Sequence, residues 1–247
     1  MNKSDTIKTF AIVLASGSGS RFNSEDCPKH LIKIKDVPTI IWTLDSVLGS
    51  KIFDKVVVVT REKDLKNTNE IISKYFNTEE LKLLFTVGGN DRMQSFFNGV
   101  LKISEKAQIE DNDLVALIDS NRPFCSIKQL KDLNNLATEN GCSCPARPVV
   151  NGVAKIISNK ITEVPAKDNY VEFVTPEFLE YQLLDKSKKK NKTFKSLVEY
   201  SLDMSVNPIF LTSSDLNSKL TYPEDLVFLE GLVNKYNLAK PLKKNEH

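Results

Sequence analysis

Short apolar runs alternate with amphipathic stretches in the first part of the chain, and this alternation constrains the fold most strongly. Residues 10–15 (FAIVLA), 55–60 (KVVVVT) and 114–119 (LVALID) are nearly continuous apolar runs. Such runs are typical of strands that are buried on both faces of a sheet. Residues 82–87 are expected to form a further strand, which ends at a Gly-Gly pair.

Helical patterns lie between these strands. They begin near Pro38, Asp64 and Asp91, and a fourth has Ser126 as its N-cap and Gly141 at its end. Strand and helix in repeated succession predict an α/β fold of Rossmann-like type, with a mostly parallel twisted sheet and helices on both faces.

The pattern changes after Cys144. Residues 150–165 hold two turn signals, Asn151-Gly152 and Ser158-Asn159, which predict a β-hairpin arm. Further along, Thr175-Pro176 is expected to open a helix, residues 186–192 (KSKKKNK) to form a solvated loop, and residues 208–214 a late strand. A final helix begins at Pro223. We expect a single domain over residues 1–247 with an arm projecting at about 148–172.

Composition narrows the class of protein. The 247 residues carry a net charge of +2, which gives no reason to expect a nucleic-acid or membrane surface. No apolar run is long enough to span a bilayer, and the polar N-terminus lacks the apolar core of a signal peptide. The four cysteines fit neither a disulfide framework nor a zinc spacing, so we expect reduced thiols in a cytoplasmic protein.

The segment LASGSGSRFNSEDCPKH, residues 14–30, holds a Gly/Ser-rich turn after the first strand. It lacks the third glycine of a dinucleotide fingerprint, where Phe22 stands, and it lacks the G-K-[ST] of a P-loop. Two interpretations stay open: a plain strand-to-helix turn, or a triphosphate loop. In the second, backbone N–H groups form an anion nest, Arg21 offers a planar fork and Lys29 a point charge.

Other segments of this kind stand at strand ends or helix starts. GGNDR follows the strand expected at residues 82–87, and Asp119 ends the strand expected at 114–119, just before Asn121-Arg122-Pro123. The other two are Thr175-Pro176 and, before the last helix, Lys219-Leu220-Thr221. In an open α/β sheet, ligands bind in the crevice beyond the carboxyl ends of the strands. Several of these segments are expected to converge there.

Together these segments resemble the cytidylyltransferases of the methylerythritol-phosphate and ribitol-phosphate type. The family pattern is L-A-x-G-x-G-x-R…P-K, G-G-x-x-R, H-D-x-x-R-P, T-P-Q-x-F and N-I-K-x-T-x-P-E-D-L. The chain has LASGSGSR…PK, GGNDR, IDSNRPF, TPEFL and NSKLTYPEDL, in the same order, from Phe10 to about Leu232. The resemblance implies a nucleotidyltransferase fold.

The resemblance also implies roles for individual residues. The triphosphate would lie on the loop Gly17, Ser18 and Gly19, with Arg21, Lys29 and Lys219 as the catalytic cations. Cytosine and ribose recognition falls to Ala15, Ser16, Gly89, Asn90 and Ser95. Asp119, next to Ser120, matches the family's magnesium-associated aspartate, so Mg²⁺ is the implied cofactor. The acceptor would be bound by Arg122, Lys167 and Thr175.

Most departures from the pattern fall on the acceptor side. The histidine before the aspartate is Ile118, and Lys167 stands where the family has arginine. Where the methylerythritol enzymes have D-T-x-K, the chain has residues 152–155, GVAK, so the aspartate is replaced by Gly152. The triphosphate side is largely intact.

The expected reaction is transfer of CMP from CTP to a phosphorylated polyol or sugar, with release of pyrophosphate. The product would be a CDP-linked precursor for a cell-surface polymer. Alternatives are the methylerythritol-phosphate enzyme of isoprenoid synthesis and a non-catalytic nucleotide-binding module. The resemblance further implies a homodimer formed through the arm.

Overall fold

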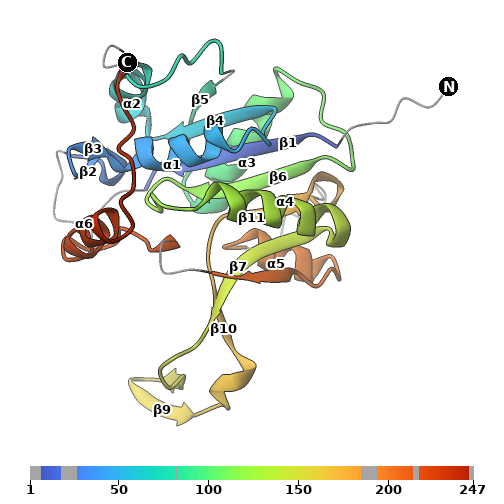
Figure 1. The fold of residues 1–247 in the computed structure, drawn as a ribbon. Coiled ribbons are helices and arrows are strands. Elements are labelled where there is room, and N and C mark those ends of the chain that lie inside the picture. Colours follow the sequence, from blue (N-terminus) through green and yellow to red (C-terminus); the bar gives the residue numbers. More distant parts are fainter. Residues whose placement is uncertain (1–6, 18–26, 82, 185–193, 214–216, 245–247) are drawn as a thin grey trace.

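The computed structural model describes residues 7–17, 27–81, 83–184, 194–213 and 217–244. Its centre is an eight-stranded sheet with the order β10-β7-β11-β6-β1-β4-β5, and β12 pairs with β7 (Figure 1). The strands are β1 (Thr9–Ala15), β4 (Lys55–Thr60), β5 (Leu83–Val87), β6 (Leu114–Asp119), β7 (Cys142–Pro148), β10 (Val171–Phe173), β11 (Glu177–Glu180) and β12 (Ile209–Thr212). The predicted α/β fold with helices packed on a largely parallel sheet is confirmed.

The side chains of β1 divide between the two faces of the sheet. Ala11, Val13 and Ala15 belong to one buried cluster, and Phe10 and Ile12 belong to the other. The first cluster packs against helices α1 (Thr39–Gly49), α2 (Leu65–Ser73), α4 (Ile127–Asn140) and α6 (Asp225–Lys235). The second packs against α3 (Arg92–Ser104) and α5 (Leu197–Asp203). A strand covered on both faces needs apolar residues at every position, as the sequence has.

Helix ends follow the local chemistry of the sequence. The Ser126 side chain accepts a hydrogen bond from the backbone N–H of Gln129 at the start of α4, and Asp91 does the same for Gln94 at the start of α3. Gly141 ends α4 with a φ of 80°, a conformation that glycine adopts without strain. The caps predicted at Ser126 and Gly141 are confirmed, and Asp91 caps the helix that was expected to begin near it.

The order of the parallel strands indicates where a ligand-binding crevice is expected. From β1 the chain moves to β4 and then to β5 on one side, and then returns across β1 to β6 on its other side. The topology therefore reverses between β1 and β6, where Leu14 is paired with Asp119. A crevice opens beyond the carboxyl ends of the strands at such a point, and ligands of α/β proteins bind there.

The predicted arm is a hairpin that stands away from the sheet (Figure 1). Strands β8 (Lys155–Ile157) and β9 (Lys160–Glu163) pair antiparallel around Ser158 and Asn159, which both have positive φ. At the base of the arm, β10 returns alongside β7. The helices in the described part of the chain include none that is long and apolar enough to cross a membrane.

The helix predicted to open at Thr175-Pro176 is wrong. Thr175-Pro176 is a cis peptide, and strand β11 follows it. This strand fills the space between β6 and β7 and pairs antiparallel with both, which fully buries Phe178 and Leu179. Pairing between strands distant in sequence thus overrides the local proline signal. Strands β7 and β10, helix α5, and the short hairpin β2 (Lys33–Ile34) with β3 (Val37–Pro38) were also not predicted.

Candidate active site

A polar cavity of about 440 Å³ opens beyond the carboxyl ends of β1, β5 and β6. Its lining comes from five separate segments of sequence: Leu14, Ala15, Ser16 and Gly17; Lys29 and His30; Gly89, Asn90, Asp91, Arg92 and Ser95; Asp119, Ser120 and Asn121; Lys219 and Thr221. The volume is within the usual range of small-ligand pockets. We call it the nucleotide cavity, after the ligand that the sequence analysis predicts for it.

The structure brings most of the residues predicted from sequence to this cavity. Ala15, Ser16, Gly17, Lys29, Gly89, Asn90, Ser95, Asp119, Ser120 and Lys219 all line it. Ser18, Gly19 and Arg21 lie outside the described residues. Arg122 lines a neighbouring cavity instead. Neither cavity is lined by Lys167 or Thr175.

Ser95 joins two walls of the nucleotide cavity. Its hydroxyl accepts hydrogen bonds from Ser16 Oγ at 3.1 Å and from the backbone N–H of Gly89 at 3.0 Å, and it donates to the carbonyl of Asp91. The packing here is tight, because a Cβ on Gly88 would lie 2.7 Å from Ser16 Cβ. The loop after β5 is thereby fixed against the end of β1.

Lys29 links the first sequence motif to the last. It begins a short 3-10 helix (Lys29–Leu31), and its Nζ donates a 2.8 Å hydrogen bond to the carbonyl oxygen of Thr221. The neighbouring His30 is buried, with Nε2 2.9 Å from Thr68 Oγ1. Burial lowers the pKa of His30 to about 4. His30 is therefore a neutral, hydrogen-bonded residue of the cavity wall.

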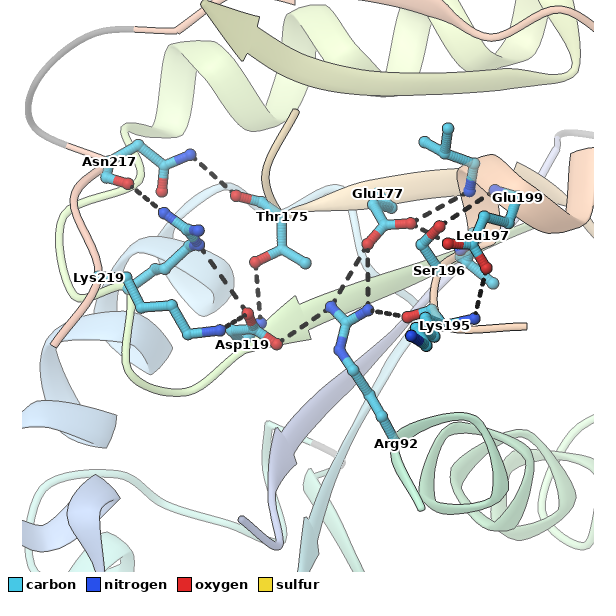
Figure 2. Close-up of polar contacts among 12 residues, drawn as sticks. Arg92, Asp119, Thr175, Glu177, Lys195, Ser196, Leu197, Glu199, Asn217 and Lys219 are labelled. Atoms are coloured by element: carbon cyan, nitrogen blue, oxygen red, sulfur yellow. Dashed lines mark hydrogen bonds and ion pairs between the residues drawn. The ribbon is translucent and has the colours of Figure 1, made fainter. Parts of the chain in front are cut away.

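Asp119 lies at the centre of a cluster of cations (Figure 2). Its Oδ2 accepts a 2.7 Å hydrogen bond from Lys219 Nζ, and its Oδ1 accepts one of 3.2 Å from Arg92 Nη2. Arg122 Nε is 3.9 Å from Oδ2. Burial would raise the pKa of Asp119, but these positive charges together hold the pKa well below its usual range. The Asp119 carboxylate is therefore ionised, and three cationic side chains surround it.

Glu177 is a member of this cluster that the sequence did not reveal. It is 1% exposed, and its Oε1 lies 3.3 Å from Arg92 Nη2. Its Oε2 accepts hydrogen bonds from the backbone N–H groups of Leu197 and Val198 at the start of α5. Burial raises the pKa of Glu177. The available signal was its place in the TPEFL segment, where the resembling family has glutamine.

Asp119 is suited to be a magnesium ligand, but the remaining ligands would have to come from substrate phosphates and water. Within the described part of the chain, no group of three or more His, Cys, Asp or Glu side chains could hold a metal ion. Mg²⁺ is usually bound through one or two carboxylates, with substrate phosphates and water completing its shell. The ionised carboxylate of Asp119, which lines the cavity, meets that requirement if the Lys219 or Arg92 contact gives way.

A second cavity of about 340 Å³ adjoins the first and shares Lys219 and Thr221 with it. Its other lining residues are Arg122, Arg147, Val174, Ser213, Asn217, Ser218, Tyr222, Asp225 and Phe228. Thr175 does not line this cavity but contacts residues of both cavities. Its Oγ1 is 3.4 Å from the backbone nitrogen of Asp119, and its carbonyl accepts from Asn217 Nδ2 at 2.8 Å.

A sequence model of IspD, 2-C-methyl-D-erythritol 4-phosphate cytidylyltransferase, matches residues 9–235. The chain belongs to the IspD family of cytidylyltransferases. Members of this family are nucleotidyltransferases that act with CTP, so the resemblance and the enzyme class predicted from the sequence are confirmed.

Curated relatives carry two different names. A ribitol-5-phosphate cytidylyltransferase of Lactiplantibacillus plantarum is 26% identical over 92% of this chain and 98% of the relative. A 2-C-methyl-D-erythritol 4-phosphate cytidylyltransferase of Dictyoglomus thermophilum is also 26% identical, over 94% and 99%. Identity alone therefore does not separate the two acceptors.

Solved structures agree on the fold. A 4-diphosphocytidyl-2C-methyl-D-erythritol synthase of Anaerococcus prevotii has a TM-score of 0.76 at 22% identity, covering 92% of this chain and 96% of that one. The Francisella tularensis IspD has a TM-score of 0.74 at 23% identity, with 94% and 100% covered.

Proposed function

We propose that the protein transfers CMP from CTP to a phosphorylated alditol or sugar of the ribitol-phosphate type. The convergence of Lys29, Lys219 and Asp119 on one cavity at the sheet's switch point carries this proposal. Motifs separated by up to 192 residues meet there through direct hydrogen bonds. A module that only bound nucleotide would have no need for this set of charges beside the reacting phosphates.

The reaction needs positioning and charge stabilisation more than proton transfer. A phosphate monoester is anionic at neutral pH, so its oxygen attacks the α-phosphorus of CTP without a general base. The new P–O bond forms as the bond between the α-phosphorus and the bridging oxygen breaks, and pyrophosphate leaves with that electron pair. Fixed cations at the phosphates lower the barrier, because negative charge gathers there in the transition state.

Individual residues take separate parts in this step. Lys29 stabilises charge on the α-phosphate, and Lys219 and Arg21 hold the triphosphate with the N–H groups of residues 17–19. The wall of Ala15, Ser16, Gly89, Asn90 and Ser95 binds cytidine. Asp119 would hold Mg²⁺, which when bound neutralises phosphate oxygens and orients them. Arg92, anchored by Glu177, keeps Asp119 in place.

The departures on the acceptor side support an acceptor other than methylerythritol phosphate. Gly152 replaces the aspartate of the methylerythritol enzymes and presents no side chain to a substrate hydroxyl. Lys167 is exposed on the arm, with its Nζ 3.1 Å from the carbonyl of Val150. Methylerythritol phosphate stays the second candidate because the matching family description names it.

We further propose a homodimer that forms through the arm, which would bring Lys167 to a partner's site. The hairpin exposes apolar side chains: Val150 (80%), Ile156 (66%), Ile157 (58%), Ile161 (68%) and Val164 (70%). A two-stranded hairpin is marginal in water unless another surface covers it. Sedimentation of the wild type against an Ile156→Lys, Ile161→Lys double variant tests this; a monomeric wild type would contradict it.

Pyrophosphate release tests the proposed reaction. Each nucleoside triphosphate, with Mg²⁺, is assayed against D-ribitol 5-phosphate, glycerol phosphates, pentose phosphates and methylerythritol phosphate. We expect release with CTP and an alditol or sugar phosphate. No release across the panel from folded protein that binds CTP would overturn the proposal.

A further inference from the structure

Arg92 is shared between two buried carboxylates, and Figure 2 shows its guanidinium between them. Its Nη2 lies 3.2 Å from Asp119 Oδ1 and 3.3 Å from Glu177 Oε1. Its Nη1 donates to Glu177 Oε1 at 3.4 Å and to the carbonyl oxygen of Lys195 at 2.6 Å. Of these three acceptor residues, Asp119 is the one that lines the nucleotide cavity. Arg92 therefore keeps two further partners if Asp119 binds something else.

Glu177 is held in position independently of the nucleotide cavity. It is 1% exposed, and its Oε2 accepts hydrogen bonds from the backbone N–H groups of Leu197 at 2.6 Å and Val198 at 3.2 Å. These contacts, like those from Arg92, all come from donors, and an ionised carboxylate is the form that only accepts. Glu177 is thus a fixed negative charge on the far side of Arg92 from Asp119 (Figure 2).

The two carboxylates differ in what else they can bind. Asp119 faces the cavity where the triphosphate would lie, so a metal ion bound to Asp119 would take its negative charge away from Arg92. With Asp119 as its only carboxylate partner, the partly buried Arg92 would be left unpaired, and removing one partner of a buried ion pair is strongly destabilising. Glu177 avoids that cost, because it stays paired with Arg92 when Asp119 is released.

We propose that Glu177 is a positioning residue that lets Asp119 exchange Arg92 for Mg²⁺, an inference that rests on the proposed function. Glu177 acts through Arg92 and does not line the nucleotide cavity. The balance of charge supports this role, because the three cations around Asp119 face two carboxylates in the cluster. Without Glu177, the same three cations would face Asp119 alone and would hold it against a metal ion.

Calorimetric titration with CTP tests this role without an acceptor, and hence without turnover. The Kd for CTP is measured in EDTA and in excess Mg²⁺, and the ratio of the two values measures how strongly Mg²⁺ supports CTP binding. In Glu177→Gln we expect CTP to bind in EDTA at least as tightly as it binds the wild type, because the phosphates meet one negative charge fewer. The ratio should fall about fivefold or more. Structural damage would instead weaken CTP binding under both conditions.

Two further variants sharpen the test. Asp113→Asn is the matched control, since Asp113 is also a buried carboxylate that accepts from two backbone N–H groups, but it precedes β6 at the end remote from Asp119. It should keep the wild-type ratio. The double variant Arg92→Gln, Glu177→Gln removes the cation through which Glu177 acts, so its ratio should return to the wild-type value or exceed it. It leaves neither charge of this pair unpaired, so it stays measurable if Glu177→Gln alone does not fold.

The outcomes separate this inference from the proposed reaction. An unchanged ratio in folded Glu177→Gln would overturn the positioning role, and so would a double variant whose ratio lies about fivefold below that of the wild type. A wild type that binds CTP equally well with and without Mg²⁺ would also overturn it. Pyrophosphate release by the wild type would leave the proposed function standing in each of these cases. A lowered ratio in Glu177→Gln that the double variant restores supports the positioning role, even if no acceptor in the panel reacts.

Discussion

Lys29 Nζ donates a 2.8 Å hydrogen bond to the carbonyl oxygen of Thr221, 192 residues away in sequence. The contact ties the loop after β1 to the segment before α6, and it fixes a positive charge at the boundary of the two cavities. A cation held in place before substrate binds costs little reorganisation during the reaction. Lys29 is therefore the side chain whose loss should slow the chemical step most.

Lys29→Ala should lower kcat by a factor on the order of 10², by analogy with the loss of one preorganised donor. Steady-state kinetics with saturating CTP measure the effect, and the unfolding midpoint shows that the variant is folded. Lys33→Ala is the control, since Lys33 is an exposed lysine four residues on. Near-normal turnover in Lys29→Ala would remove Lys29 from the mechanism.

Glu177→Ala should destabilise the protein by about 3 kcal/mol, because it leaves Arg92 without one carboxylate and the first N–H groups of α5 without an acceptor. Glu177→Gln, which keeps an acceptor and loses the charge, should cost about 1.5 kcal/mol or less. Urea unfolding measures both. Glu163→Gln, on the exposed arm, should change stability by less than about 0.5 kcal/mol. Equal losses in the two Glu177 variants would mean that charge, not hydrogen bonding, matters.

The lowered pKa of His30 predicts that the free energy of unfolding depends on pH. The unfolded chain takes up a proton near the ordinary pKa of 6.5, while the folded protein resists protonation until about pH 4. Stability associated with His30 is therefore complete above pH 6.5 and declines as the pH falls toward 4. Between pH 7 and 5, the free energy of unfolding of the wild type should fall by about 2 kcal/mol more than that of His30→Gln. Parallel pH profiles for the two proteins would contradict this assignment.

Gly88→Ala should weaken CTP binding. The added Cβ would lie 2.7 Å from Ser16 Cβ and 2.8 Å from Ser95 Oγ, so the wall of the nucleotide cavity must shift. We expect a rise of about tenfold in the Kd for CTP and a stability loss of about 1–3 kcal/mol. Gly231→Ala is the control, since its added Cβ would have no heavy atom within 4 Å apart from its chain neighbours and the backbone of its own helix. Unchanged CTP binding in Gly88→Ala would mean that this wall does not contact the nucleotide.

The sequence predicted the parts of the fold that local pattern determines. The apolar runs of β1, β4 and β6 need burial on both faces, and Ser126 and Gly141 cap α4 by their own chemistry. Strand β11 could not be predicted in this way, since its strand state depends on pairing with β6 and β7 rather than on its own residues. The same holds for Glu177, whose partners come from α3 and α5.

Residues of the nucleotide side were predictable because each stands at a strand end or helix start, where an α/β sheet gathers its ligands. Arg147, which lines the second cavity, was not predicted as a cavity residue because it lies inside β7, and the sequence did not reveal β7 as a strand. Its position beside Arg122 depends on how β7 and β6 are arranged around β11.

A competition between two acceptors tests the central claim most directly. D-ribitol 5-phosphate and methylerythritol phosphate are mixed at equal concentration with CTP, Mg²⁺ and enzyme, and the two CDP-linked products are counted by mass spectrometry early in the reaction. The product ratio equals the ratio of the two kcat/KM values. We predict at least about tenfold more CDP-ribitol than methylerythritol product, which corresponds to about 1.4 kcal/mol. A mixture dominated by the methylerythritol product would contradict the account and assign the protein to the other acceptor.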